Sequence, residues 1–121
     1  MPLYVDGFLL AVPRKNLEKY RRMAKTAGKV WKEHGALEYR ECVADDVKAK
    51  GAVSFPKGVK ARKGETVFFS YIVYKSRAHR DRVNKKVMQD PRILAMMPGN
   101  AEMPFDLKRM CYGGFETLVE A

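Results

Sequence analysis

The chain has 121 residues, with 24 Lys and Arg against 14 Asp and Glu, a formal net charge of +10 and an apolar fraction of 46%. This length and composition predict a single domain over residues 1–121 with a buried core, and they exclude intrinsic disorder and a second catalytic unit. Cys42 and Cys111 form neither a CxxC motif nor a zinc spacing, so we expect free thiols rather than a disulfide scaffold. Without a basic leader or an apolar run approaching ~18 residues, the sequence predicts a cytoplasmic protein with no membrane span.

The first third of the chain predicts a strand followed by a helix. Residues 3–12 are almost continuously apolar and end at Pro13, which favours a short strand. Asn16 is a candidate N-cap, and Gly35 provides a stop for the helix that follows. Apolar side chains recur between them at spacings of three and four, as in an amphipathic helix, at Leu17, Tyr20, Ala24, Ala27, Trp31 and His34.

The middle of the chain predicts two strands joined by a long basic connection. Residues 36–44 alternate in polarity, as in a half-exposed strand near a sheet edge. Residues 45–64 form the connection, whose basic side chains lie within residues 48–63 at Lys48, Lys50, Lys57, Lys60, Arg62 and Lys63. Residues 65–75 are β-branched or aromatic on both faces and give the clearest strand in the chain.

The last third predicts a second helix and a final strand. Ser76 is a candidate N-cap for a helix over residues 77–89, which Asp90-Pro91 ends. We expect residues 92–105, rich in Met and Pro, to be irregular. Residues 110–119 predict a last strand that the Gly113-Gly114 pair interrupts.

This order of elements predicts an α+β fold with an antiparallel sheet, the ferredoxin-like βαββαβ plait. In a monomeric plait two helices cover one sheet face and water wets the other, so strands should alternate in polarity. The first and third strands are instead apolar on both faces. A homodimer in which two sheets face each other, a dimeric α+β barrel, is the economical explanation. The alternative is that the connection or residues 92–105 cover the second face.

Several segments together resemble the YbaA-like family of small bacterial proteins of unknown function. They are Tyr4–Phe8, Glu33–Leu37, Asp45–Val47, Asp90–Arg92, Met103–Met110 and Gly113–Phe115. The resemblance runs nearly end to end and implies a ferredoxin-like dimeric α/β barrel, but it brings no settled activity. Relatives by fold include cofactor-independent monooxygenases, muconolactone-type isomerases and haem-binding proteins, and fold alone does not choose among these functions.

Polar residues that interrupt apolar strands are the candidates for a small-molecule site between the sheet and its cover. Asp6, Ser70, Glu41, Tyr112 and Glu116 are such interruptions. A desolvated Asp6 could act as a general base, with His34 or Arg109 as acid or anion stabiliser. Equally, Asp6 could pair with Lys108 or Arg109 or mark a bulge, and His34 could be a capping or packing histidine.

The segment from Met96 to Arg109 is the second candidate feature. It could form a lid with Phe105 as its plug and Arg109 reaching a carboxylate of the ligand. Alternatively, Met103 and Phe105 dock on a partner subunit and Asp106 pairs with Arg109. The predicted ligand-binding residues are therefore Asp6, Ser70, Phe105, Arg109 and Tyr112, with Asp6 and His34 as candidates for catalysis.

The remaining signals indicate no cofactor and a weaker second class of function. Two histidines without partners at ligand spacing give no metal or haem site. The basic residues of the first helix lie on the face opposite its apolar stripe, as on any solvated helix, and no nucleic-acid-binding motif is visible. We therefore predict a homodimer that binds or converts a small anionic or aromatic metabolite in a pocket lined by the first, third and last strands. The alternative is a non-catalytic basic protein that binds nucleic acid or another polyanion weakly.

Overall fold

The computed structural model describes residues 2–121 and shows an α+β fold built on one antiparallel sheet, in the strand order β2-β3-β1-β4. The strands are β1 (Tyr4–Pro13), β2 (Glu38–Val43), β3 (Glu65–Tyr74) and β4 (Cys111–Glu116). The helices are α1 (Leu17–Glu33), α2 (Phe55–Gly58), α3 (Arg77–Val87) and α4 (Pro91–Leu94), with single 3-10 turns η1 (Arg14–Asn16) and η2 (Leu107–Arg109). The predicted class, α+β with an antiparallel sheet, is confirmed.

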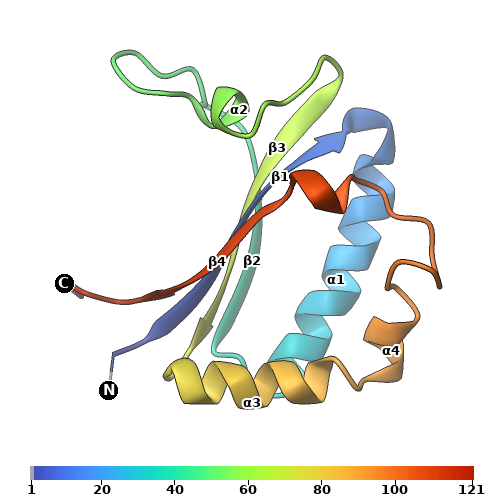
Figure 1. Cartoon of the computed structure of the whole chain (residues 1–121), viewed down its shortest axis with the longest axis vertical. Coiled ribbons are helices and arrows are strands. Elements are labelled where there is room, and N and C mark those ends of the chain that lie inside the picture. Colours follow the sequence, from blue (N-terminus) through green and yellow to red (C-terminus); the bar gives the residue numbers. More distant parts are fainter. Residues whose placement is uncertain (1) are drawn as a thin grey trace.

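One face of the sheet carries the long helices. Figure 1 shows α1, α3 and α4 on one side of the strands, and α2 on the other side. Successive side chains of β1 and β3 point to opposite faces of the sheet. Those that point toward α1 and α3 form the core. Two groups of buried side chains fill it, one around Val30, Ile72 and Tyr74 and the other around Leu10, Val12 and Phe68.

The opposite face of the sheet is apolar and only partly covered. Phe55 of α2 packs against Phe69 at 6.0 Å between ring centroids, so the 45–64 connection covers one end of this face. Phe69 nevertheless stays 48% exposed and Phe115 64% exposed. The side chains that share this face are Val5, Leu9, Val67, Phe69, Tyr71, Val73, Cys42, Cys111 and Phe115.

Local structure corrects the predicted ends of several elements. The connection contains the short helix α2, whose N-cap Ser54 accepts a hydrogen bond from the Lys57 amide. The segment expected to be irregular begins with α4, because Asp90 caps that helix by accepting from the Arg92 amide. Asn16 precedes α1 as predicted but makes no cap bond, and its Nδ2 donates instead to the Pro104 carbonyl at 3.0 Å.

The glycine pair does not interrupt the last strand. Gly113 and Gly114 pair in register with Gly7 and Asp6 of β1, and β4 runs on to Glu116, short of the predicted Val119. A Cβ at Gly114 would lie 2.8 Å from ring carbons of Tyr4, so the absence of a side chain lets β4 pass over that ring.

Gly28 in the middle of α1 has a packing role that offsets its poor helix propensity. A Cβ at this position would lie 2.8 Å from Cδ1 of Tyr39, closer than van der Waals contact permits. The missing side chain lets the Tyr39 ring of β2 lie under α1, where its hydroxyl donates to Glu41 at 2.7 Å. Gly28 therefore sets how close the helix lies to the edge strand.

We expect Gly28→Ala to lower the free energy of unfolding by about 1–3 kcal/mol, the usual cost of overpacking, although alanine is the better helix former. Gly58→Ala is the matched control, since nothing lies within 4 Å of a Cβ there. Urea unfolding measures both. Equal stability of the two variants would contradict the packing role of Gly28.

Candidate ligand-binding pocket

A cavity of about 390 Å³ lies between the sheet, α1 and the segment from Met88 to Met110. Its volume is within the range of small-molecule sites. Aromatic side chains line it from three directions: Phe8 from β1, Trp31 from α1 and Phe105 from the segment before η2. Six methionines also line the cavity, namely Met23, Met88, Met96, Met97, Met103 and Met110. Thioether side chains are flexible and polarisable, so this wall can adapt to apolar ligands of different shape.

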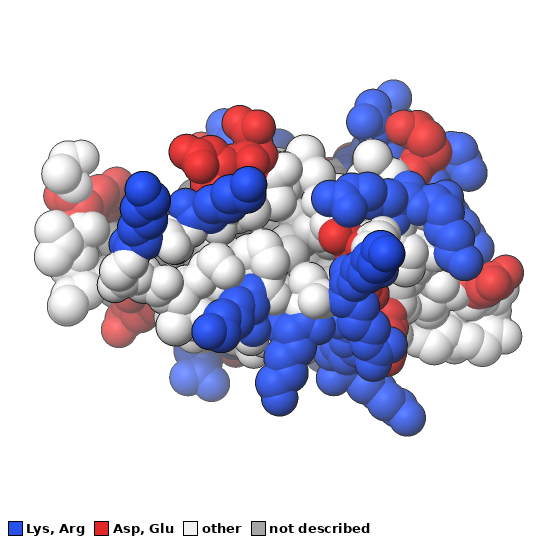
Figure 2. Space-filling model, turned by 90° about the horizontal axis from the view of Figure 1, so that it is seen from above, with Lys and Arg blue, Asp and Glu red and all other residues white. Residues whose placement is uncertain are grey.

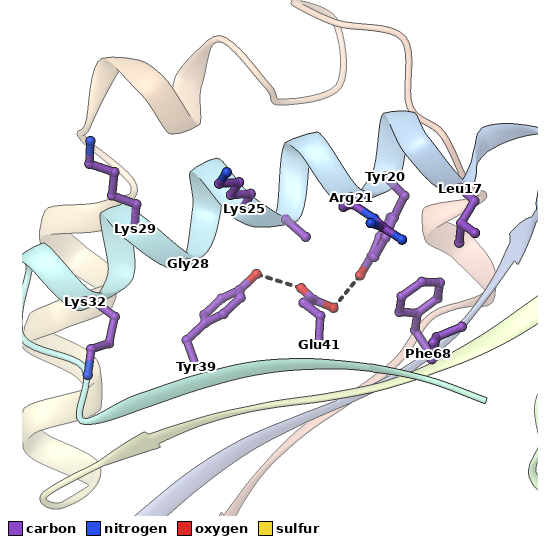
Figure 3. Close-up of a pocket in the computed structure, with 12 residues that line it drawn as sticks. Leu17, Tyr20, Arg21, Lys25, Gly28, Lys29, Lys32, Tyr39, Glu41 and Phe68 are labelled. Atoms are coloured by element: carbon purple, nitrogen blue, oxygen red, sulfur yellow. Dashed lines mark hydrogen bonds between the residues drawn. The ribbon is translucent and has the colours of Figure 1, made fainter. Parts of the chain in front are cut away.

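A half-buried carboxylate forms the polar end of the cavity. Glu41 of β2 accepts a hydrogen bond from the Tyr20 hydroxyl of α1 at 2.8 Å and one from the Tyr39 hydroxyl at 2.7 Å. The Ser70 hydroxyl of β3 donates to the same carboxylate. Figure 3 shows Glu41 rising from β2 between the two tyrosines. We call Tyr20, Tyr39, Glu41 and Ser70 the Glu41 cluster.

The electrostatics of the Glu41 cluster keep its hydroxyls protonated. Burial raises the pKa of Tyr20 and of Tyr39 well above the ordinary value, and the nearby Glu41 carboxylate raises both further. An ionised carboxylate offers about four lone-pair sites. Three hydroxyls occupy three of these sites, two on Oε1 and one on Oε2, so one site on Oε2 has no hydrogen-bond partner within residues 2–121.

A second hollow of about 570 Å³, which we call the outer groove, runs between α1 and β2. It shares Tyr20, Ala24, Tyr39 and Glu41 with the cavity, so the two hollows adjoin along these residues. Figure 3 shows this groove, with α1 along one side and Tyr39 and Glu41 at its base. Its remaining lining includes apolar side chains and the basic residues Arg21, Lys25, Lys29 and Lys32.

Ser70 and Phe105 are the predicted ligand-binding residues that line the cavity. Ser70 belongs to the Glu41 cluster. Phe105 contacts the Tyr20 ring edge-on at 5.6 Å between centroids, so the segment before η2 packs against α1 beside the cavity. The predicted lid segment thus packs within its own chain, with Met103 also in the lining.

Asp6 and Tyr112 lie in a separate polar network under α3. Asp6 is 1% exposed and pairs with Nη1 of Arg80 at 2.9 Å, rather than with Lys108 or Arg109 as the sequence reasoning considered. The same Nη1 donates to the Tyr112 hydroxyl at 3.0 Å. Burial raises the pKa of Asp6, and Arg80 opposes that effect. This network joins α3 to β1 and β4 because the inward face of β1 at Asp6 meets α3 and not the η2 segment.

His34 and Arg109 also lie outside the cavity lining. His34 Nε2 lies 2.9 Å from Oδ2 of Asp90, which links the end of α1 to the start of α4. Arg109 donates to both oxygens of Glu65 at 2.7 and 2.9 Å and to the Lys60 carbonyl. Asp106, the partner considered for Arg109, instead accepts from the Lys108 amide and caps η2.

Sequence reasoning missed most of the cavity lining. Glu41 was noted as a polar interruption, and the alternation of residues 36–44 places it on the same side of β2 as Tyr39. The sequence spacing places Tyr20 on the apolar stripe of the helix. Its ring does pack on Phe68, at 4.6 Å between centroids, but its hydroxyl also reaches Glu41. The predicted lining by the first, third and last strands therefore changes to β1, β2, β3 and α1.

Two kinds of feature, a cluster of metal ligands and a membrane-spanning helix, are absent from residues 2–121. No group of three or more His, Cys, Asp or Glu side chains there is arranged to hold a metal ion. No helix in the same range has the length and apolar character needed to cross a membrane. Both cysteines, Cys42 and Cys111, are free and exposed.

Comparison with known proteins shows the family. The family described as "Protein of unknown function (DUF1428)" matches residues 3–107, and the chain belongs to it. It is also 47% identical over 117 residues to "Uncharacterized protein YbaA" of Escherichia coli strain K12 and of Shigella flexneri, covering 97% of each chain. The resemblance to the YbaA-like family is confirmed.

A solved structure supports the fold alone. The chain is similar to an uncharacterized NIPSNAP domain protein from Burkholderia xenovorans, with a TM-score of 0.57 at 13% sequence identity, covering 98% of this chain and 94% of that one. The similarity places both proteins in related α+β folds.

The Arg109–Glu65 pair predicts a pH-dependent stability. The Arg109 guanidinium, with a smaller effect from Arg62 and its amide, lowers the pKa of Glu65 from 4.5 to about 2. A carboxylate whose pKa is lowered on folding stabilises the folded state above its unfolded pKa and loses that effect as the pH falls toward the folded value. We expect Arg109→Ala to cost about 3 kcal/mol at neutral pH, since it leaves a buried carboxylate unpaired.

Urea unfolding at a series of pH values measures this effect. The difference in free energy of unfolding between the wild type and Arg109→Ala should be constant above pH 4.5 and shrink between 4.5 and about 2. Arg40→Ala is the control, because its pair with Glu38 is exposed and 3.8 Å long, and should cost less than about 1 kcal/mol. A difference that does not change with pH would refute the assignment.

Proposed function

We propose that this protein binds a small aromatic or similarly apolar molecule that carries a hydrogen-bond donor. The observation that carries the proposal is the methionine-lined cavity that ends at the Glu41 carboxylate, with one acceptor site left free. The apolar walls favour an aromatic body, and the free lone pair selects a hydroxyl or an amine at its polar end. For the predicted anionic or aromatic metabolite, this places the aromatic body and the donor group in the cavity; an anionic group would have to lie away from Glu41, because it would be repelled by the carboxylate there.

Conversion of the ligand belongs to the same proposal. Glu41 is the one carboxylate among the residues that line the cavity, so a metal-free reaction there would use it to accept a proton from the ligand. The candidates Asp6 and His34 are each engaged elsewhere, by Arg80 and Asp90. Glu41, rather than Asp6 or His34, is therefore the proposed catalytic residue.

We also propose that two copies associate through the uncovered sheet face, as a homodimeric barrel of ferredoxin-like plaits. The strand order, with the long helices on one face, supports the plait. The uncovered face is apolar and nearly neutral, with Glu38 and Arg40 as an opposed pair at its edge, which suits a second copy of the same surface. The two exposed free thiols fit the reducing cytoplasm as the proposed location.

Binding of nucleic acid is the less favoured alternative. Figure 2 shows that basic side chains gather over the middle and right of the face seen from above, with acidic groups among them, and that the left end is mostly uncharged. The exposed aromatic rings Phe69 and Phe115 lie on the apolar sheet face, and exposed Phe55 of α2 packs against Phe69, so none of the three lies among the lysines of α1. Stacking of bases together with phosphate binding would need both on one surface.

We expect 1-naphthol to bind to the wild type, and Glu41→Gln to weaken this binding about tenfold, because a hydrogen bond to a charged group is lost. Isothermal titration calorimetry gives the affinities. Glu38→Gln is the matched control, since this residue lies on the same strand and is exposed on the other face. 1-Methoxynaphthalene, which lacks the donor, should bind equally to the wild type and Glu41→Gln.

The indole N–H signal of Trp31, the single tryptophan, reports the location of binding by NMR. That N–H donates to Tyr74 and Asn84, and Trp31 itself lines the cavity, so a ligand inside should shift its resonance. Absence of both heat and shift with 1-naphthol at saturating solubility would overturn the proposed function. An affinity that Glu41→Gln leaves unchanged would overturn the role of the carboxylate.

The proposed dimer predicts that Phe69→Asp yields a monomer, because it places a charge at the centre of the apolar face. Val43→Asp is the matched control, since Val43 is 52% exposed against 48% for Phe69 but lies on the helix-bearing face. Light scattering should give about twice the chain mass for the wild type and the control. A wild type with the mass of one chain, 13.9 kDa, would refute the dimer.

A further inference from the structure

The outer groove carries charges that the proposed function does not use. Arg21, Lys25, Lys29 and Lys32 line it at spacings of four and three, which places them on one stripe of α1. Lys25, Lys29 and Lys32, which the sequence places opposite the apolar stripe, are exposed, and together with Arg21 they line this groove. They flank a hollow that opens beside the apolar stripe, because α1 overhangs the edge strand β2.

The partners of these four basic residues leave their charge available to a ligand. Lys32 donates to the Leu37 carbonyl at 2.7 Å, and Nε of Arg21 lies 3.5 Å from exposed Glu18. Within residues 2–121, Lys25 and Lys29 take part in none of the ion pairs. Figure 3 shows Arg21 beside Tyr20 at one end of the groove and Lys32 at the other end.

The base of the outer groove is apolar apart from the Glu41 cluster. Leu17, Val43 and Phe68 line one end, and the Tyr39 ring lies under Gly28. Glu41 is the only acid in the lining, and three of its acceptor sites are occupied by the hydroxyls of its cluster. An apolar base with a cationic rim suits a ligand that has an apolar portion and an anionic group.

We propose that the outer groove is the anion subsite of the same binding site, so that the ligand is an amphipathic anion. Its apolar body occupies the methionine-lined cavity, its donor group meets Glu41, and a carboxylate or similar anion lies in the outer groove near Arg21 and Lys25. Tyr20, Ala24, Tyr39 and Glu41 line both hollows, so the two adjoin, and a molecule bound beside the Glu41 cluster at their junction would contact both. The inference rests on the proposed function and adds the chemical class of the ligand.

The test compares two ligands of the same shape that differ in charge, 1-naphthylacetate and 1-naphthylacetamide, by isothermal titration calorimetry at low salt. We expect the carboxylate to bind about tenfold more tightly than the amide. Arg21→Ala combined with Lys25→Ala should reduce that advantage to about threefold or less and leave the amide affinity unchanged. Raising the salt from about 0.05 M to about 0.5 M should likewise weaken only the carboxylate, because added ions screen exposed charges.

The matched control is Lys15→Ala combined with Arg22→Ala, which removes two exposed charges that do not line the outer groove. It should retain the full advantage of the carboxylate, whereas a reduction equal to that of the groove variant would show an effect of net charge alone and overturn the inference. Equal affinity of the two ligands for the wild type would overturn the anion subsite and leave the proposed function standing. Displacement of 1-naphthylacetate by single-stranded poly-uridine at equal charge concentration would assign the groove to a polyanion instead.

Discussion

The arrangement around the cavity depends on the three hydrogen bonds that the Glu41 carboxylate accepts. Glu41 lies on the edge strand and accepts hydrogen bonds from hydroxyl groups of α1, β2 and β3. It therefore connects the helix to the sheet at a point where apolar packing is interrupted. A buried carboxylate is costly unless it is hydrogen-bonded, and three donors offset that cost here. The same three bonds position residues that line both the cavity and the outer groove.

The other charged clusters of the described chain brace the elements around the cavity. Arg80 and Asp6 join α3 to the central strand, while Asp90 and His34 join the end of α1 to α4. Arg109 fixes η2 against the start of β3 through Glu65. The segment from Met88 to Met110 is thus held at both ends, and between them its methionines and Phe105 face the cavity. A segment that is anchored at both ends and carries flexible methionine side chains between them can adapt to a ligand better than rigid core side chains can.

The net charge of +10 has more than one physical role in this structure. Part of it neutralises buried or half-buried carboxylates, as at Arg80 and Arg109, where guanidinium groups form short pairs. Another part stands along the outer groove on α1 beside an apolar base. Charge alone therefore does not indicate nucleic acid, because the surroundings of each basic side chain decide what it can bind.

The sequence by itself determined most of the strands and helices, because apolar periodicity and residues such as Gly35 and Pro91 act over a few neighbouring positions. The order of these elements indicated the fold class, and several segments along the chain indicated the family. It also marked Ser70 and Phe105 as residues of the cavity. Only the tertiary structure decided the partners of Asp6, His34 and Arg109, and brought Tyr20, Tyr39 and Glu41 to one point. Such contacts depend on strand register and on the distance between α1 and β2, which Gly28 sets, and neither quantity is encoded in local spacing.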